Sequence, residues 1–393
     1  MEHDRDRIRD FALSYTEAWC SHDPEKVARH FAPGGTIAIW VGMDVHARST
    51  EAAAIDVLTG ELRRARFGSG LEPVVEWLDA LPQPVHACYE AGPTGSGLYR
   101  AAQAAGIRVD VVAPSKTPRA PGDRVKSDRK DAQLLVRLLM AGALTAVAVP
   151  PAEFEAARDL TRAREQVRRD LMRCRHRVSK LLLRYGRVYE GGSTWTQAHR
   201  RWLASQRFAH TASELAYLDA LAAVDGLASR KVALEERLSR LALEPQWWPT
   251  VARLRCFRGL DTLSALVLQL EVHDWERFRR APQVAAWLGL TPSLSQSGES
   301  ASQGPITKTG SGYARRILVE AAKHYARAPR IGATLVNRQQ GQPDHVLQIA
   351  WRAQHRLYRL DRRLRERGKP ANVVTVALAR ELSCFLWAAA VAP

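Results

Sequence analysis

The sequence predicts an α/β domain with a mixed β-sheet, then a long helical segment, then a mainly helical C-terminal region. Three patterns lead to this fold class. Buried-type strands alternate with helices up to residue 150, apolar residues recur at steps of three and four from 152 to 187, and helical periodicity continues to Trp387. The predicted parts are a helical appendage at 1–35, the α/β domain at 36–150, a coiled-coil linker at 151–246 and a C-terminal domain at 247–393.

The appendage at 1–35 has the pattern of two short helices. Ile8, Phe11 and Tyr15 share one helical face, and Asp23 followed by Pro24 supplies a break before the second helix. A Pro-Gly-Gly run ends the segment at Gly35. These residues predict no role for the appendage.

The α/β domain begins with an apolar strand at 37–45 that carries Asp44 near its end. A Thr-Gly turn signal at residues 59 and 60 separates two further strands, as in a hairpin. Strands then alternate with helices: helix 71–81, strand 85–90, helix 98–105 and strand 109–113. Hairpin strands followed by this alternation indicate a mixed sheet. Asp44 and Glu90 fall at the carboxyl ends of their strands, where such sheets place their sites.

Another helix is expected to open at Asp128. Asp128 and Asp131 are three residues apart, so their carboxylates share a face of its first turn. Two carboxylates side by side repel each other. A divalent cation such as Mg²⁺, which prefers carboxylate oxygens, removes that repulsion. The alternative is an exposed first turn whose acids favour the positive end of the helix dipole.

The linker contains one long helical run from 152 to 187, with apolar residues at coiled-coil spacing. A second run between Leu227 and Leu241 is expected to return antiparallel to it. Arginines outnumber acids along the first run, which favours contact between nucleic-acid phosphate and residues such as Arg168 and Arg169. A solvated coiled-coil face is the alternative explanation of the same arginines.

The C-terminal domain begins with residues 251–270, where a turn at Gly259 joins two helical runs and resembles a helix-hairpin-helix. A polar, serine-rich loop is predicted at 293–304, and it carries Ser297. For a serine in such a loop, a simple linker is the alternative. Helices are expected from Tyr313 onward, and seven arginines between 352 and 367 form a basic stripe on one of them.

The charge balance indicates a polyanionic partner. Lys and Arg number 58 against 41 Asp and Glu, a net charge of +17, and such an excess is typical of nucleic-acid-binding proteins. An acidic membrane surface is the competing partner. However, no apolar run approaches the roughly 20 residues that span a bilayer, and the N-terminus lacks the order of a signal peptide. We therefore expect a cytoplasmic protein without membrane contact. The five cysteines are scattered and predict neither a zinc site nor a disulfide framework.

Four acids stand out by position: Asp44, Glu90, Asp128 and Asp131. Each lies at the end of a predicted element of one domain. Such an arrangement can hold one or two Mg²⁺ ions, which polarise a phosphodiester during displacement at phosphorus. Scattered caps and turn residues are the alternative that spacing alone leaves open.

Four motifs occur in order along the chain: Gly42-Met43-Asp44-Val45-His46, Tyr89-Glu90-Ala91-Gly92, the run from Lys126 to Ala132, and Leu288 to Pro292 followed by Ser297-Gly298. This series resembles that of the DEDD insertion-sequence transposases, the bridge-RNA-guided recombinases. The similarity runs from about Trp40 to Trp387, and only the first 35 or so residues lie outside it. It implies an RNase-H-like (RuvC-like) domain, a coiled-coil linker and a C-terminal transposase domain.

The resemblance also implies residue roles. The four acids match the metal-binding tetrad, and Ser297 matches the serine that attacks a DNA phosphate and forms a covalent phosphoserine link. Ser295 is the alternative nucleophile, but Ser297 is preferred because Gly298 follows it. A noncoding guide RNA would pair with donor and target DNA, and a homodimer or homotetramer is expected. Nucleic-acid contacts are predicted at Arg129, Lys130, Arg168, Arg169, Lys308, Arg315 and Arg316.

Two other functions fit some of the same residues. The acids alone suit a metal-dependent, structure-specific nuclease of the Holliday-junction type, which would leave free ends and would not depend on Ser297. The positive charge alone suits a non-catalytic nucleic-acid-binding protein. The presence of all four acids and the serine argues against a decayed site.

Overall fold

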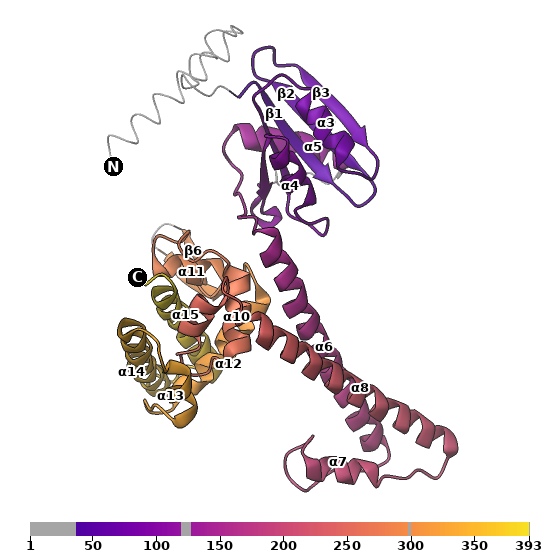
Figure 1. Cartoon of the computed structure of the whole chain (residues 1–393), viewed down its shortest axis with the longest axis vertical. Helices are drawn as coiled ribbons and strands as arrows, with labels where there is room; N and C mark the ends of the chain where they lie inside the picture. The colour runs from indigo at the N-terminus through magenta and orange to yellow at the C-terminus, as the bar shows by residue number, and fades with distance from the viewer. Residues whose placement is uncertain (1–36, 119–126, 298–299, 393) are drawn as a thin grey trace. The chain divides into compact units, whose positions relative to one another are not determined.

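The computed structural model describes residues 37–118, 127–297 and 300–392, and the chain divides after Val149 into two compact units (Figure 1). The appendage predicted at 1–35 lies outside the described residues. The linker predicted at 151–246 and the C-terminal domain predicted at 247–393 both fall within the second unit.

The first unit is built on a five-stranded mixed sheet, as predicted. Its strands are β1 (Ile39–Val45), β2 (Thr50–Asp56), β3 (Leu62–Phe67), β4 (Val85–Glu90) and β5 (Arg108–Val112), in the order β3-β2-β1-β4-β5. β1, β2 and β3 pair antiparallel, whereas β1, β4 and β5 run parallel. The carboxyl ends of these three parallel strands therefore meet at one edge of the sheet.

Helices cover both faces of this sheet. On one face, α3 (Glu72–Asp79) and α4 (Gly97–Ala104) share a core with Val41 and Met43 of β1. On the other face, α5 (Asp128–Met140) packs against β1, β2 and β4. Because successive side chains of a strand point to opposite faces, the even-numbered residues of β1 face α5. A short 3₁₀ turn, η1 (Pro114–Lys116), follows β5.

The second unit begins with two long helices that lie side by side (Figure 1). They are α6 (Ala152–Arg184) and α8 (Thr211–Leu241), with the short α7 (Gln197–Ala204) between them in the chain. Arg164 pairs with Glu235, and the Tyr185 and Ser213 hydroxyls lie 2.7 Å apart. Rising numbers on α6 thus meet falling numbers on α8, so the helices run antiparallel. Coiled-coil packing between them stays a prediction.

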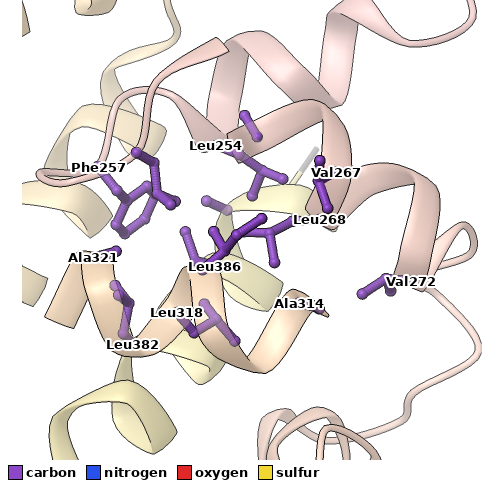
Figure 2. Close-up of a cluster of buried hydrophobic side chains, with 14 of the residues drawn as sticks. Leu254, Phe257, Val267, Leu268, Val272, Ala314, Leu318, Ala321, Leu382 and Leu386 are labelled. Carbon is purple, nitrogen blue, oxygen red and sulfur yellow. The ribbon is translucent and has the colours of Figure 1, made fainter. Parts of the chain in front are cut away.

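The rest of the second unit is mainly helical around a large apolar core. Its helices are α9 (Trp248–Leu254), α10 (Thr262–Val272), α11 (Ala281–Trp287), α12 (Gly312–Ala322), α13 (Ala333–Gln339), α14 (Asp344–Glu366) and α15 (Ala371–Ala390), with a 3₁₀ turn η2 (Lys323–Ala326). Every residue of α10 from Ala265 to Val272 is buried. Figure 2 shows Leu268 of this helix, Leu318 of α12 and Leu386 of α15 in the same cluster of buried side chains. α10 is therefore the central helix of this core.

The apolar character of α15 differs from the sequence expectation that no run approaches the length of a membrane span. Within the described chain, α15 is long and apolar enough to cross a membrane by length and composition alone. Its residues Val374, Leu378, Leu382 and Leu386 belong to the core of the second unit. Packing against α9, α11, α12 and α14 accounts for this composition without a bilayer.

Two further expectations for the C-terminal region need correction or refinement. Residues predicted as a polar loop at 293–304 form a β-hairpin of β6 (Pro292–Ser297) and β7 (Ser300–Ile306). Gly259 has φ +84° and lies against α12, where an added Cβ would meet the Ala321 carbonyl oxygen at 2.7 Å. Its lack of a side chain is explained by this internal contact, so phosphate binding by a helix-hairpin-helix stays a prediction.

Candidate active site

Asp44 and Glu90 lie on neighbouring parallel strands at the same edge of the sheet. Met43 of β1 pairs in register with Tyr89 of β4, and each acid is the next residue along its strand. Met43 and Tyr89 belong to the core on the α3–α4 face. Since side chains alternate, Asp44 and Glu90 project together to the face covered by α5.

The other two acids come from the first turn of α5. The Ser127 hydroxyl caps this helix by accepting a hydrogen bond from the Lys130 amide at 3.4 Å, and Asp128 and Asp131 follow in the first turn. Asp128 is exposed and Asp131 is half-buried. The start of α5 thus brings Asp128 and Asp131 near Asp44, and Glu90 follows the neighbouring strand at the same end of the sheet, although Glu90 and Asp131 lie outside the tight group that Asp44 and Asp128 form.

Gly42 sets the closeness of α5 to the sheet. A Cβ at this position would lie within 3.0 Å of both the Ala132 carbonyl oxygen and the Val136 amide nitrogen. Both atoms belong to the helix backbone, which cannot swing aside as a flexible side chain can. Only glycine lets α5 approach β1 this closely. The glycine two residues before Asp44 therefore helps to place the acids that open α5.

His46 joins this group, although the sequence analysis assigned it no role. Its Nε2 lies 3.1 Å from Asp44 Oδ2 and 3.7 Å from Asp128 Oδ1. One potential metal-ligating atom from each of the three residues falls within 4.8 Å of the others. The available signal was the spacing of two residues from Asp44, which places both side chains on one side of an extended chain.

Neighbouring carboxylates and burial disfavour negative charge at the end of the sheet where Asp44 and Glu90 lie. Burial raises the pKa of Asp44, the nearby charges of Asp128 and Asp131 raise it further, and His46 opposes the rise. Glu90 Oε1 is buried and has no hydrogen-bond partner among the described residues. A buried carboxylate oxygen without a donor is costly unless a cation or donor reaches it. The donor set therefore fits a hard divalent cation.

The hairpin that carries Ser297 belongs to the second unit. Ser297 ends β6 and pairs in register with Ser300, while Ser295 pairs with Ser302. The side chain of Ser295 is exposed. Gly298, which selected Ser297 in the sequence, lies outside the described residues. The two candidate serines are thus on one strand, with Ser297 at the hairpin tip.

The base of this hairpin is held by backbone contacts and by Arg315. An added Cβ at Gly289 would meet the Thr309 backbone, and one at Gly310 would meet the Trp287 carbonyl oxygen. Arg315 Nη1 donates to the Leu288 carbonyl oxygen at 2.8 Å and to the Thr309 carbonyl oxygen at 2.6 Å. Arg315 therefore has a positioning role in the structure, and its predicted contact with nucleic acid stays a prediction.

Three other predicted nucleic-acid contacts surround one buried acid. Glu165 of α6 is 4 % exposed and pairs with Arg168 at 2.8 Å, Arg169 at 3.1 Å and Arg316 at 2.8 Å. Burial raises the pKa of Glu165, but the hydrogen bond from Arg168 and the charge of Arg316 outweigh that effect and lower it. The Arg316 guanidinium ties α12 to α6, whereas Arg168 and Arg169 pair with Glu165 within α6. Arg169 is still 60 % exposed and keeps most of its surface for a ligand.

The remaining predicted contacts are exposed. Arg129 and Lys130 follow Asp128 in the first turn of α5. Lys308 lies after β7 and adopts φ +56°. Their exposure is compatible with phosphate contact, which stays a prediction for all three.

Comparison with known proteins identifies the family. The model of the Transposase IS116/IS110/IS902 family matches residues 251–337, and a DEDD transposase model of the IS110 type matches residues 41–186. The chain is 39 % identical over 360 residues to the y4qE protein of Sinorhizobium fredii, whose name describes it as a transposase, covering 89 % of this chain and 88 % of that protein.

A second relative is also a transposase. The transposase for insertion sequence element IS1533 of Leptospira borgpetersenii is 30 % identical over 347 residues, covering 84 % of this chain and 98 % of the relative. The first unit is accordingly a DEDD transposase domain with an RNase-H-like fold, and its acids indicate dependence on a divalent metal. The chain belongs to the IS110/IS116 family of insertion-sequence transposases, enzymes that act on DNA.

Proposed function

We propose that this transposase cuts and rejoins DNA with Mg²⁺ bound by Asp44, Glu90, Asp128 and Asp131 and with Ser297 as nucleophile. The observation that supports the metal assignment is the group of Asp44, Asp128 and His46 at one end of the sheet, with Glu90 on the neighbouring strand and its Oε1 buried and unpartnered among the described residues. Mg²⁺ prefers carboxylate oxygens in this kind of site. When bound, it supplies Lewis-acid polarisation of the scissile phosphodiester.

Within this proposal, His46 orients the carboxylates. Its Nε2 lies 3.1 Å from Asp44 and 3.7 Å from Asp128, so one imidazole bridges the strand and the helix that carry the acids. Such a bridge limits the rotamers of both carboxylates before the metal arrives. Ligand residues held in this way lose less freedom on binding.

The covalent step assigned to Ser297 balances without an external energy source. A bond forms between Ser297 Oγ and phosphorus while the bond between phosphorus and one deoxyribose oxygen breaks. The serine hydroxyl loses its proton, and the departing sugar oxygen gains one. One phosphate ester replaces another, so attack by a DNA hydroxyl on the phosphoserine can rejoin the strand. A hairpin base held by the hydrogen bonds of Arg315, with the serine at the hairpin tip, supports this assignment.

Partners follow from the same proposal. An element-encoded noncoding RNA would select donor and target DNA by base pairing, which the net charge of +17 and the family resemblance support. The protein would act in the cytoplasm as a homodimer or homotetramer, with the metal residues of one subunit serving the serine of another.

A trapping experiment tests the nucleophile. The purified protein with its copurified RNA is mixed with labelled DNA containing the element ends and Mg²⁺, then denatured and run on a gel. A protein–DNA adduct is expected for the wild type and for Ser295→Ala, and none for Ser297→Ala. Adduct formation by Ser297→Ala would reject the assignment. Free cut ends without any adduct would instead favour a metal-dependent nuclease.

A further inference from the structure

The helical pair α14 and α15 carries a groove that combines apolar and basic residues. Its volume is about 630 Å³. Trp351 of α14 and Phe385 of α15 contribute aromatic surface to its lining. Trp351 is 39 % exposed, and the His355 ring meets it edge-on with centroids 4.5 Å apart. The indole is therefore held by a neighbour while part of its surface stays open to the groove.

Arginines border this groove along α14. Arg352, Arg356, Arg359 and Arg363 are spaced by four, three and four residues, which places them on one helical face. The first three line the groove, and the last three line a second hollow of about 260 Å³. The two hollows share Arg356 and Arg359 and so adjoin each other along the helix.

Most of these charges have no acidic partner among the described residues. Arg356 pairs with Glu381 at 2.9 Å. Within the described part of the chain, Arg352, Arg359 and Arg363 form no ion pair with a carboxylate; Arg359 only donates to the His355 carbonyl oxygen at 3.3 Å. Like charges at this spacing destabilise a helix. An anion along the row would remove that repulsion.

We propose that this groove binds a single-stranded segment of DNA, with a base stacked on Trp351 and consecutive phosphates along the arginine row. From Arg352 to Arg363 the helix rises by about 16 Å, long enough to follow a few phosphates of one strand. Bases of an intact duplex are stacked inside it and cannot reach an aromatic wall. An unpaired strand supplies both an exposed base and a phosphate chain. Strand exchange by a transposase produces such segments.

A second copy of the chain fits this surface less well. Contact between two copies of the same arginine row across a two-fold axis would place like charges together. RNA offers the same phosphate chain. We assign DNA because the family acts on DNA, and the assignment rests on neither Ser297 nor the metal site.

The test uses the full-length protein and fluorescence anisotropy with labelled oligonucleotides: single-stranded DNA, duplex DNA and single-stranded RNA of equal length. Trp351→Leu is expected to weaken single-stranded DNA binding by about fivefold to a hundredfold, the loss of one base–aromatic stack, while duplex binding is unchanged. The double variant Arg352→Gln with Arg359→Gln should flatten the slope of log K against log salt by about 1.4, roughly 0.7 for each lost phosphate contact.

The matched control is Arg362→Gln. Arg362 is exposed on the same helix but is bonded to Tyr358 and Glu366 and lines neither hollow. It should leave single-stranded DNA binding unchanged. Thermal melting of each variant separates loss of binding from loss of fold.

Photocrosslinking gives a direct readout that does not depend on affinity. Single-stranded DNA carrying 5-iodouracil should crosslink to the peptide that contains Trp351. The proposal would be overturned if the Trp351→Leu and double-arginine variants kept the wild-type affinity and salt slope and if crosslinks formed only in peptides without Trp351. If the variants lose more affinity for single-stranded RNA than for single-stranded DNA, the choice of DNA would be overturned. A changed oligomeric state in Trp351→Leu with intact DNA binding would instead identify a subunit interface.

Discussion

The substitution Gly42→Ala tests directly how α5 and its acids, Asp128 and Asp131, are positioned beside Asp44. It changes none of these side chains. The new Cβ would lie within 3.0 Å of backbone atoms of Ala132 and Val136, whereas ordinary contact begins at 3.4 Å, so α5 must retreat by about 1 Å. Overpacking of this kind costs about 1–3 kcal/mol and lowers the melting temperature of a small domain by several degrees. A misplacement of about 1 Å can reduce a catalysed rate by about a hundredfold.

The assay has two readouts. Recombination of a plasmid-borne element in cells is scored by quantitative amplification of the new DNA junctions, normalised to protein level. Melting of the purified protein is followed by circular dichroism. Gly68→Ala is the matched control, because an added Cβ there meets nothing within 4 Å. If Gly42→Ala recombines and melts like Gly68→Ala, the close approach of α5 does not position the acids and the reasoning fails.

Three further predictions concern other parts of the site. Asp44→Asn should melt higher than the wild type in the absence of metal, because the ionised carboxylate, whose pKa burial and neighbouring acids raise, opposes the fold at neutral pH. It should also lose most of the stabilisation by Mg²⁺, which at a hundredfold excess over Kd raises the unfolding free energy of the wild type by about 2.7 kcal/mol and is read as a higher melting temperature; equal Mg²⁺ stabilisation of both proteins would contradict the tetrad. Mixing inactive Asp44→Asn and Ser297→Ala proteins should restore part of the recombination if one subunit supplies the metal site and another the serine, and failure of well-folded mixed oligomers to recombine would argue for sites within one chain. Arg315→Ala should reduce recombination far more than DNA affinity, since its guanidinium bonds to the Leu288 and Thr309 carbonyl oxygens; a matching loss of affinity and salt slope would favour nucleic-acid contact.

The sequence predicts that Asp44 and Glu90 lie at the same end of the sheet because their placement follows from strand periodicity, and their role in metal binding stays a prediction. Asp44 and Glu90 each end an apolar strand, and neighbouring parallel strands necessarily bring their carboxyl ends together. Asp128 and Asp131 open a helix, and helical spacing alone puts them on one face. The spacing of two residues puts His46 and Asp44 on one side of an extended chain, but His46 was missed because a single histidine just after the end of β1 does not by itself indicate a carboxylate partner.

The serine hairpin shows the opposite situation. Residues 293–304 are mostly small and polar, without the apolar alternation that marks a half-buried strand, so the sequence indicates a loop. The strands form because their backbones pair with each other and because the hairpin base is anchored to α11 and α12. The roles of Arg168 and Arg316 were equally hidden, since an arginine that pairs with a buried Glu165 has the same sequence signal as one that faces solvent.

Two glycines, one in the first sequence motif and one in the last, connect these findings. In the first motif, Gly42 precedes Asp44, a proposed metal ligand, and lets a helix touch a strand; in the last, Gly289 lets the chain touch the backbone of Thr309 at the hairpin base. Neither glycine offers a group for chemistry, but Gly42 stands two residues before Asp44 and Gly289 eight residues before Ser297. Under the proposed function, both motifs therefore combine a reactive side chain with a backbone contact that positions it. Substitution of the acid or the serine should remove chemistry from an intact fold, whereas substitution of either glycine should displace an intact reactive group.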